Sequence, residues 1–260
     1  MRAGTRSGRS VTFGGVVGRL LAVVFALFLV LAAYFVARGF GLYQDALAAK
    51  SLDEMAASIE GREGFTPIDQ LPDIYLQAVV AVEDHRFYAH PGFDVIATGR
   101  ALVNDIKAGA IVEGGSTITQ QLAKNQFFTQ EQTLERKVAE VFMAFTMERH
   151  FSKREILELY VNSIYFGEGY EGIGEASQGY FGKAPSDLTD YEATLLAGIP
   201  NAPSAYALTQ NPDLARQRQS QVLEKLVAHD YLSFADAQRI GAQHAAASGG
   251  NAAQDAPAAA

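Results

Sequence analysis

The longest run of apolar residues lies near the start of the chain. From Leu20 to Ala37 the sequence reads LLAVVFALFLVLAAYFVA, 18 residues without a charged side chain. As an α-helix this run would be roughly 27 Å long, close to the thickness of the hydrocarbon layer of a bilayer. The pattern therefore predicts a transmembrane helix over residues 20–37.

Two other interpretations of this run explain less. A cleaved signal peptide would suit the triplet Ala46-Leu47-Ala48, but the run is longer than the apolar region of a normal signal peptide. A buried core helix would leave the Arg residues unexplained, because four precede the run, one follows it, and residues 1–38 contain no acid. Since positive residues favour the cytoplasmic side, we expect residues 1–19 to be a basic cytoplasmic tail and the body to lie outside the membrane.

The remainder of the chain has the apolar spacing and end signals of helices. Pro72-Asp73 opens a helix that leads to Glu83. Asn211-Pro212 fits an N-cap followed by Pro in the first turn. Capping boxes, which mark helix starts, occur at Thr117/Gln120, Ser152/Glu155 and Thr189/Glu192. With no alternation of period two, the fold class that we predict is mainly α.

These signals divide the chain into five segments. Residues 38–70 read as a juxtamembrane segment and linker, residues 71–240 as the domain, and residues 241–260, rich in Ala, Gly, Gln and Asn, as a disordered tail. They follow the tail at 1–19 and the anchor at 20–37.

Composition limits the classes of function. The 260 residues carry 21 Lys+Arg and 29 Asp+Glu, a net charge of −8, but beyond residue 38 the balance is 16 against 29, or −13. This excess of acid argues against nucleic acid as a partner. With no Cys in the sequence, disulfides, thiolate metal sites and a Cys nucleophile are excluded.

A first cluster of chemical groups follows the helix that ends near residue 83. Glu83 and Asp84 stand beside two His residues where this apolar helix gives way to a Pro-Gly turn. A partly desolvated carboxylate there would have a raised pKa and could act as a general base. An ordinary solvated helix end explains the same residues equally well.

A second cluster is the sequence GGSTITQQLAKN from Gly114 to Asn125. A Gly-Gly turn that leads into a capped helix exposes backbone N–H groups, which suits an anion such as a diphosphate. Thr117, Gln120 or Gln121, and Lys124 follow at helical spacing on one face. The pattern alone favours the alternative, a capped helix with a polar outer side.

A third cluster contains Arg136, Lys137 and Glu140. The two cations could stabilise a leaving phosphate while Glu140 orients them or a cation, or Arg136 and Glu140 could simply pair along a helix. A fourth stretch, KREILELYVN, has a helical apolar face, and we expect its Tyr160 and Asn162 to be structural. None of the clusters has the spacing of a zinc site, a Walker loop or a Rossmann loop.

The order of these clusters resembles one family. EDHRFYAHPG, GGSTITQQLAKN, RKVAE and KREILELYVN are similar to the successive motifs of the peptidoglycan glycosyltransferases, family 51 of the glycosyltransferases, and the similarity extends over roughly residues 71–232. The resemblance implies a lysozyme-like domain of two lobes. It also implies polymerisation of lipid II into β-1,4-linked glycan with inversion and release of undecaprenyl diphosphate.

The resemblance also implies roles for residues. Glu83 matches the base that takes the proton of the acceptor's 4-hydroxyl, and Glu140 matches a Glu near the donor's diphosphate, so both are our catalytic candidates. Gln132 stands where many relatives have Arg, so one phosphate contact of the family is absent here or is supplied by Arg136 or Lys137. The predicted substrate-binding residues are Ser116, Thr117, Gln120, Gln121, Lys124, Arg136, Lys137 and Asp84.

Chemistry from the residues agrees with this assignment. Diphosphate is already a good leaving group, so the reaction needs one base and cationic stabilisation rather than the pair of carboxyl groups that glycan hydrolysis uses. No cofactor is required by this scheme. A divalent cation, Mg or Mn, on the diphosphate is compatible with it, but the sequence contains no dedicated set of ligands.

Partners and location follow from the same resemblance. We expect lipid II, the growing glycan strand, the membrane and other cell-wall synthesis or division proteins as partners, in a single-pass protein of the bacterial inner membrane with its catalytic domain outside. Because no Ser-x-x-Lys occurs, we expect a member without the transpeptidase half. Phe127-Phe128 could enter the bilayer interface or be buried. The alternatives are a non-catalytic glycan-binding scaffold and a glycan-cleaving enzyme on the same architecture.

Overall fold

The computed structural model describes residues 13–110, 114–129 and 131–251. Within these residues the chain is helical and forms no strand, and a single isolated bridge joins Tyr165 to Glu171. The prediction of a mainly α fold is confirmed. The α-helices are α1 Phe13–Ala49, α2 Leu52–Glu60, α3 Asp73–Glu83, α4 Val95–Ala108, α5 Ile118–Phe127, α6 Leu134–His150, α7 Lys153–Val161, α8 Ile173–Phe181, α9 Asp190–Gly198, α10 Pro203–Tyr206, α11 Pro212–Ala228 and α12 Phe234–Asn251. Short 3₁₀ helices are η1 Ile68–Gln70, η2 Phe87–Ala89, η3 Pro185–Asp187 and η4 Ile199–Asn201.

The local end signals set the helix starts. All three predicted capping boxes form, at the first turns of α5, α7 and α9, and a fourth joins Ser51 to Glu54 at the start of α2. In each box the side-chain oxygen of Ser or Thr accepts the amide proton of the third helical residue. Pro212 occupies the first turn of α11 as expected, although the Asn211 side chain makes no capping bond.

Two groups of helices enclose the core. α3, α9 and α11 pack against one another, and α5 lies between α6 and α7. Large side chains fill the space between them, among them the fully buried Tyr75, Phe87 and Tyr160. Since α3 contributes to the first group and the chain then enters α5 of the second, the loops that follow α3 lie at the junction of the groups.

The stretch that precedes α3 is part of the domain rather than a linker. Met55 and Ile59 of α2 are completely buried in the same core. Asn162, the C-cap of α7, fixes this stretch because its amide accepts from the backbone N–H of Thr66 (2.8 Å) and donates to the Thr66 carbonyl (2.9 Å). The expected linker over residues 38–70 therefore differs from the structure, since a short amphipathic helix found a core to pack against.

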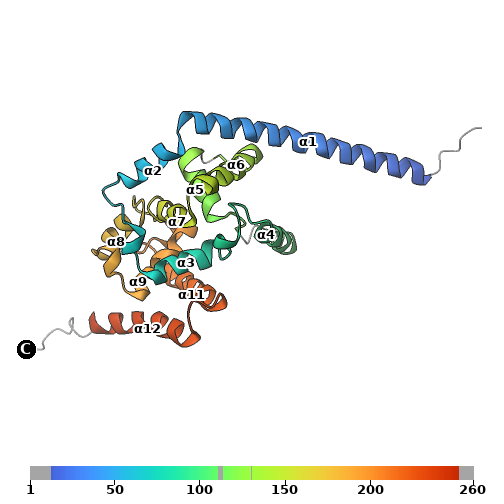
Figure 1. Cartoon of the computed structure of the whole chain (residues 1–260). Coiled ribbons are helices and arrows are strands. Elements are labelled where there is room, and N and C mark those ends of the chain that lie inside the picture. The colour runs from blue at the N-terminus through green and yellow to red at the C-terminus, as the bar shows by residue number, and fades with distance from the viewer. Residues whose placement is uncertain (1–12, 111–113, 130, 252–260) are drawn as a thin grey trace, which may run out of the picture.

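The two ends of the described chain are helical. α12 continues past Gly241, where we expected a disordered tail, as far as Asn251, and residues 252–260 lie outside the described part. At the other end α1 lies against α6 near its C-terminus and then extends away from the body (Figure 1). Over Val17–Ala49 this helix is long and apolar enough to cross a membrane.

We predict that Ile59→Ala destabilises the domain by about 2–5 kcal/mol, because it removes a fully buried side chain from the core. Urea unfolding of the purified protein measures the change. The matched control is Glu60→Ala, an exposed residue of the same helix, which should change stability by less than about 0.5 kcal/mol. Equal stability of the two variants would mean that α2 lies outside the cooperative unit.

Candidate active site

A cavity of about 1100 Å³ opens where the two groups of helices meet. Its wall is built from the end of α3, from α4, from the segment that enters α5, and from α11. The residues that line it include Glu83, Asp84, Ser116, Thr117, Gln121 and Lys124. The fold thus brings the first two sequence clusters to one surface.

Glu83, the last residue of α3, carries its carboxylate at this wall. Gln121 Nε2 donates a hydrogen bond of 2.8 Å to Glu83 Oε2, whereas Oε1 is inaccessible to solvent and has no hydrogen-bond partner among the residues described. Burial raises the pKa of Glu83, and the Gln121 bond and the nearby cations Arg218 and Lys124 partly oppose that rise. A desolvated carboxylate of this kind is well suited to accept a proton.

Tyr160 orients the amide that holds Glu83. The Tyr160 hydroxyl is buried and donates to Gln121 Oε1 at 3.2 Å. Because the oxygen of the amide faces Tyr160, its NH₂ group must face Glu83. Tyr160, expected to be structural, therefore acts on the site through Gln121.

Lys124 follows Gln121 by three residues on the same face of α5. Its side chain is partly buried in the cavity wall, and burial lowers the pKa of Lys124. Neighbouring Arg136 and Lys137 lower that pKa further, whereas Glu140 raises it. Lys124 is therefore a partly desolvated cation beside Glu83, and cations in such settings bind phosphate strongly.

The third sequence cluster lies behind this wall, on α6. Glu140 is buried between two cations: Lys137 Nζ donates to its Oε2 at 2.9 Å, and Arg136 Nε lies 3.0 Å from its Oε1 as an ion pair. Lys137 Nζ also donates to Ser116 Oγ at 2.6 Å. None of these three α6 residues is among those that line the cavity, so Glu140 contacts the site through Lys137 and Ser116.

Asp84 lines the cavity, but its carboxylate is engaged by groups of the protein itself. Both of its carboxylate oxygens lie 3.0 Å from His90 Nε2, and Oδ2 also accepts the backbone N–H of Ile118 at 3.1 Å. The N-terminus of α5 is therefore already occupied by a carboxylate of the protein itself. The expectation that its first N–H groups are open to an anion is corrected accordingly, since the Asp84 charge already compensates that helix end.

Gln120 is also used internally. Its Oε1 accepts the backbone N–H of Thr117 at 3.1 Å in the capping box, and the residue is fully buried and absent from the cavity wall. Of the two adjacent glutamines, Gln121 is the one that faces the site. Thr117 lines the cavity, but its hydroxyl donates to the Gly92 carbonyl at 2.7 Å.

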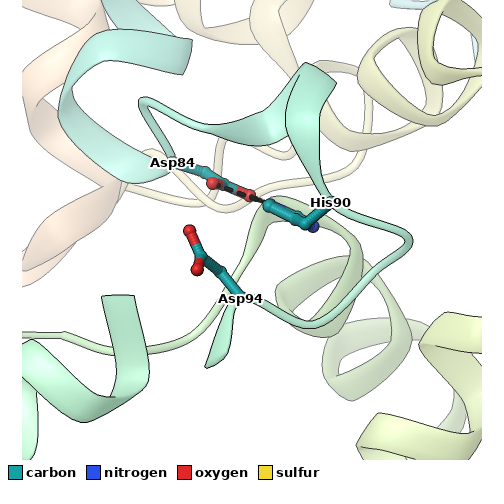
Figure 2. Close-up of side chains that lie close together, drawn as sticks. All are labelled: Asp84, His90 and Asp94. Carbon is teal, nitrogen blue, oxygen red and sulfur yellow. Dashed lines mark hydrogen bonds and ion pairs between the residues drawn. The ribbon is translucent and has the colours of Figure 1, made fainter. Parts of the chain in front are cut away.

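Asp84 and Asp94 line the cavity and lie close to His90, with ligand atoms of the three residues within 4.8 Å of one another (Figure 2). Asp94 Oδ1 accepts the amides of Ile96 and Ala97, and Oδ2 pairs with Arg86. His90 Nδ1 accepts the amide of Gly92, so its proton is on Nε2 and points at Asp84. Since a metal would have to replace these bonds, the cluster suits a structural network better than an ion.

α11 supplies residues that the sequence reasoning did not name. Arg218, Gln221 and Lys225 recur at helical spacing and line the cavity opposite α5. Arg218 Nε is buried without a hydrogen-bond partner in the described part of the chain, and its Nη1 donates to Gln221 at 2.9 Å. The sequence signal that could have identified these residues is the spacing of polar side chains along one face of the predicted helix.

Gln132 is exposed just before α6, and Phe127 and Phe128 are partly buried and pack against the core.

Comparison with known proteins identifies the family of this chain. The transglycosylase family model matches residues 50–227, which is more than half of the chain, so the chain belongs to the transglycosylase family. The matched region is a glycosyltransferase domain of the type found in class A penicillin-binding proteins.

Two relatives illustrate the match. Penicillin-binding protein 1F of Bacillus subtilis is 45% identical over 71% of this chain and 26% of its own length. Penicillin-binding protein 1A of Aquifex aeolicus is 46% identical over 65% of this chain and 23% of its own length. The chain thus spans about a quarter of the length of these relatives. A crystal structure of penicillin-binding protein 1A from Haemophilus influenzae overlaps 68% of this chain and 17% of that chain at 20% identity, with a TM-score of 0.41.

We predict that Asp84→Asn lowers the free energy of unfolding by about 1–3 kcal/mol. The uncharged Asn side chain cannot compensate both the His90 N–H and the backbone N–H of Ile118 as the carboxylate of Asp84 does. Urea unfolding at neutral pH checks this. Asp69→Asn, at an exposed residue paired with Arg154, is the control and should change stability by less than about 0.5 kcal/mol. An Asp84 variant as stable as the control would contradict the structural assignment.

Proposed function

We propose that this protein is a membrane-anchored peptidoglycan glycosyltransferase that polymerises lipid II. One observation carries the proposal: the desolvated carboxylate of Glu83 and the partly buried ammonium of Lys124 share one cavity wall, with Gln121 between them. A transfer to a sugar hydroxyl with a diphosphate leaving group needs this pair of groups, a base and a cation.

In the proposed reaction Glu83 accepts the proton of the acceptor's 4-hydroxyl. The hydroxyl oxygen attacks the donor's anomeric carbon, a new β-1,4 bond forms with inversion, and the bond from that carbon to the diphosphate oxygen breaks. The electron pair of the broken bond leaves with undecaprenyl diphosphate. Lys124 stabilises the negative charge that develops on the diphosphate.

The α6 cluster supports Lys124 in this scheme. Lys137 bonds Ser116 of the cavity wall, and Arg136 and Lys137 together enclose Glu140. We assign Glu140 the part of a buried counter-charge that keeps these cations in place, close to the diphosphate. No step of the scheme depends on a metal ion, and a divalent cation on the diphosphate stays a prediction.

Two features of the surface support a position at the bacterial cytoplasmic membrane. The apolar part of α1 is exposed along its length, with Leu20 at 63% and Leu27 at 64%. α4 also presents exposed apolar side chains, notably Val95 and Ile106, each 71% exposed. Exposed apolar surface on this scale suits a lipid environment.

The C-terminal part of α1 supports a retained anchor over a cleaved signal peptide. The Ala46-Leu47-Ala48 triplet lies inside this helix, and Ala46 and Leu47 pack against the core. In our proposal the N-terminus is cytoplasmic, the domain lies outside the membrane, and the glycan strand and other wall-synthesis proteins are its partners.

We expect Glu83→Gln to reduce polymerisation of labelled lipid II at least about 100-fold, because the amide keeps the shape of the side chain but cannot take the proton. Products of the full-length protein are resolved by size on a gel. Glu60→Gln, at an exposed residue of α2 that does not line the cavity, is the control and should leave the product ladder unchanged. A wild type that binds glycan but makes no polymer would favour the scaffold, and shortening of preformed glycan would favour a hydrolase.

The pH dependence of the reaction tests the environment of Glu83. Arg218 lowers the pKa of Glu83, so Arg218→Gln should leave that pKa higher. Because the base works only when deprotonated, the acid limb of the pH–rate profile should then move to higher pH. Arg216→Gln, on the same helix but outside the cavity wall, should not move the limb. A limb that stays in place or moves to lower pH in the Arg218 variant would contradict this assignment.

A further inference from the structure

The contact between α1 and α6 leaves no room for a side chain at Gly39. A Cβ atom built there would lie 2.6 Å from Val138 Cβ and 2.7 Å from the Glu135 carbonyl oxygen. Gly39 is buried although both of its neighbours in the chain are exposed. Gly41, two residues later in the same helix, has no atom within 4 Å of the corresponding position. The absence of a side chain is thus required at Gly39 and not at Gly41.

Aromatic and polar contacts continue this interface along both helices. Phe40 meets Phe142 edge to face at 5.2 Å between ring centroids, and Tyr43 lies 5.9 Å from the same ring. The Tyr43 hydroxyl is 3.0 Å from Thr146 Oγ1. From Gly39 to Tyr43 the contacts move by one turn along α1. Their partners on α6 move from Val138 to Phe142 and Thr146, which is one to two turns in the same direction.

The order of these contacts shows the direction of α6 relative to α1. Gly39 meets Glu135 and Val138, and Tyr43 meets Phe142 and Thr146, so the two helices run in the same direction. The first turn of α6 is consequently the part nearest to the apolar end of α1. Gly39 lies two residues after Ala37, the end of the uncharged run, which corresponds to roughly 3 Å along a helix.

The same first turns of α6 carry the cations of the site. Arg136 and Lys137 lie within the span 135–138 that flanks Gly39, and they point to Glu140 and Ser116 rather than to α1. α1 itself is one helix without a break from Phe13 to Ala49. α1 is therefore in direct contact with the helix whose cations lie behind the cavity wall.

We propose that Gly39 is a positioning residue whose close contact with α6 holds Arg136 and Lys137 at the height of the lipid headgroups. The inference rests on the proposed function, since its ligand is the diphosphate of a membrane-embedded lipid. In a bilayer that diphosphate lies at the boundary between headgroups and water. A helix held at this height meets it without either partner leaving the membrane surface.

The test compares Gly39→Ala with Gly41→Ala in the full-length protein. Both variants and the wild type are reconstituted in vesicles of phosphatidylethanolamine and phosphatidylglycerol that contain lipid II. Because a Cβ at position 39 must separate α1 from α6, the KM for bilayer-embedded lipid II should rise about tenfold or more in Gly39→Ala. Gly41→Ala should keep the wild-type KM.

A second substrate separates height above the membrane from general damage. With a water-soluble lipid II analogue of short chain, the height of α6 is irrelevant, so Gly39→Ala should retain most of the wild-type activity. The inference is overturned if Gly39→Ala behaves as wild type in vesicles, or if it loses activity equally on both substrates. A wild type that fails on both substrates would instead overturn the proposed function.

A milder variant covers the case in which Gly39→Ala does not fold, which circular dichroism and thermal unfolding would reveal. Tyr43→Phe removes only the hydroxyl contact with Thr146 and keeps the ring against Phe142. We expect a smaller rise of KM in vesicles and none with the soluble analogue. An unchanged KM in vesicles for this variant, with Gly39→Ala unfolded, would also count against the inference.

Discussion

The site depends on the buried carboxylate of Asp84. It accepts the N–H of His90 and the first helical N–H of α5, so it joins the end of α3 to the beginning of α5. A buried charge is tolerated only where donors compensate it, and here the donors are His90, six residues after Asp84, and Ile118 of α5. As a result Glu83, the residue before Asp84, lies beside Gln121 and Lys124 of α5.

Two carboxylates of this region are placed in opposite surroundings. Glu83 accepts a single hydrogen bond, from the Gln121 amide, and is otherwise desolvated, whereas Glu140 is enclosed by Arg136 and Lys137. Environments that differ in this way give the same chemical group different tasks. The first suits a base, and the second suits a counter-charge. An overall excess of acid in the body therefore does not prevent a local concentration of cations beside the cavity.

Some of this arrangement could be predicted from sequence, because the signals are local. A capping box brings together residues three apart, so the starts of α5, α7 and α9 were predictable from the sequence. The pairing of Arg136 with Glu140, four residues apart on one helix, was equally predictable. α2 was missed because nine residues are too few for a strong periodic signal, and its helix depends on burial of Met55 and Ile59.

The sequence by itself determined the helical class, the apolar run of α1 and the identity of the chemical groups, since these follow from residue type and short spacing. The tertiary structure decided how those groups are used. It turned Gln121 rather than Gln120 toward Glu83, engaged Asp84 inside the fold, and brought Arg218 to the same cavity. Such choices depend on contacts between residues tens of positions apart, and only the packing of the helices sets those contacts.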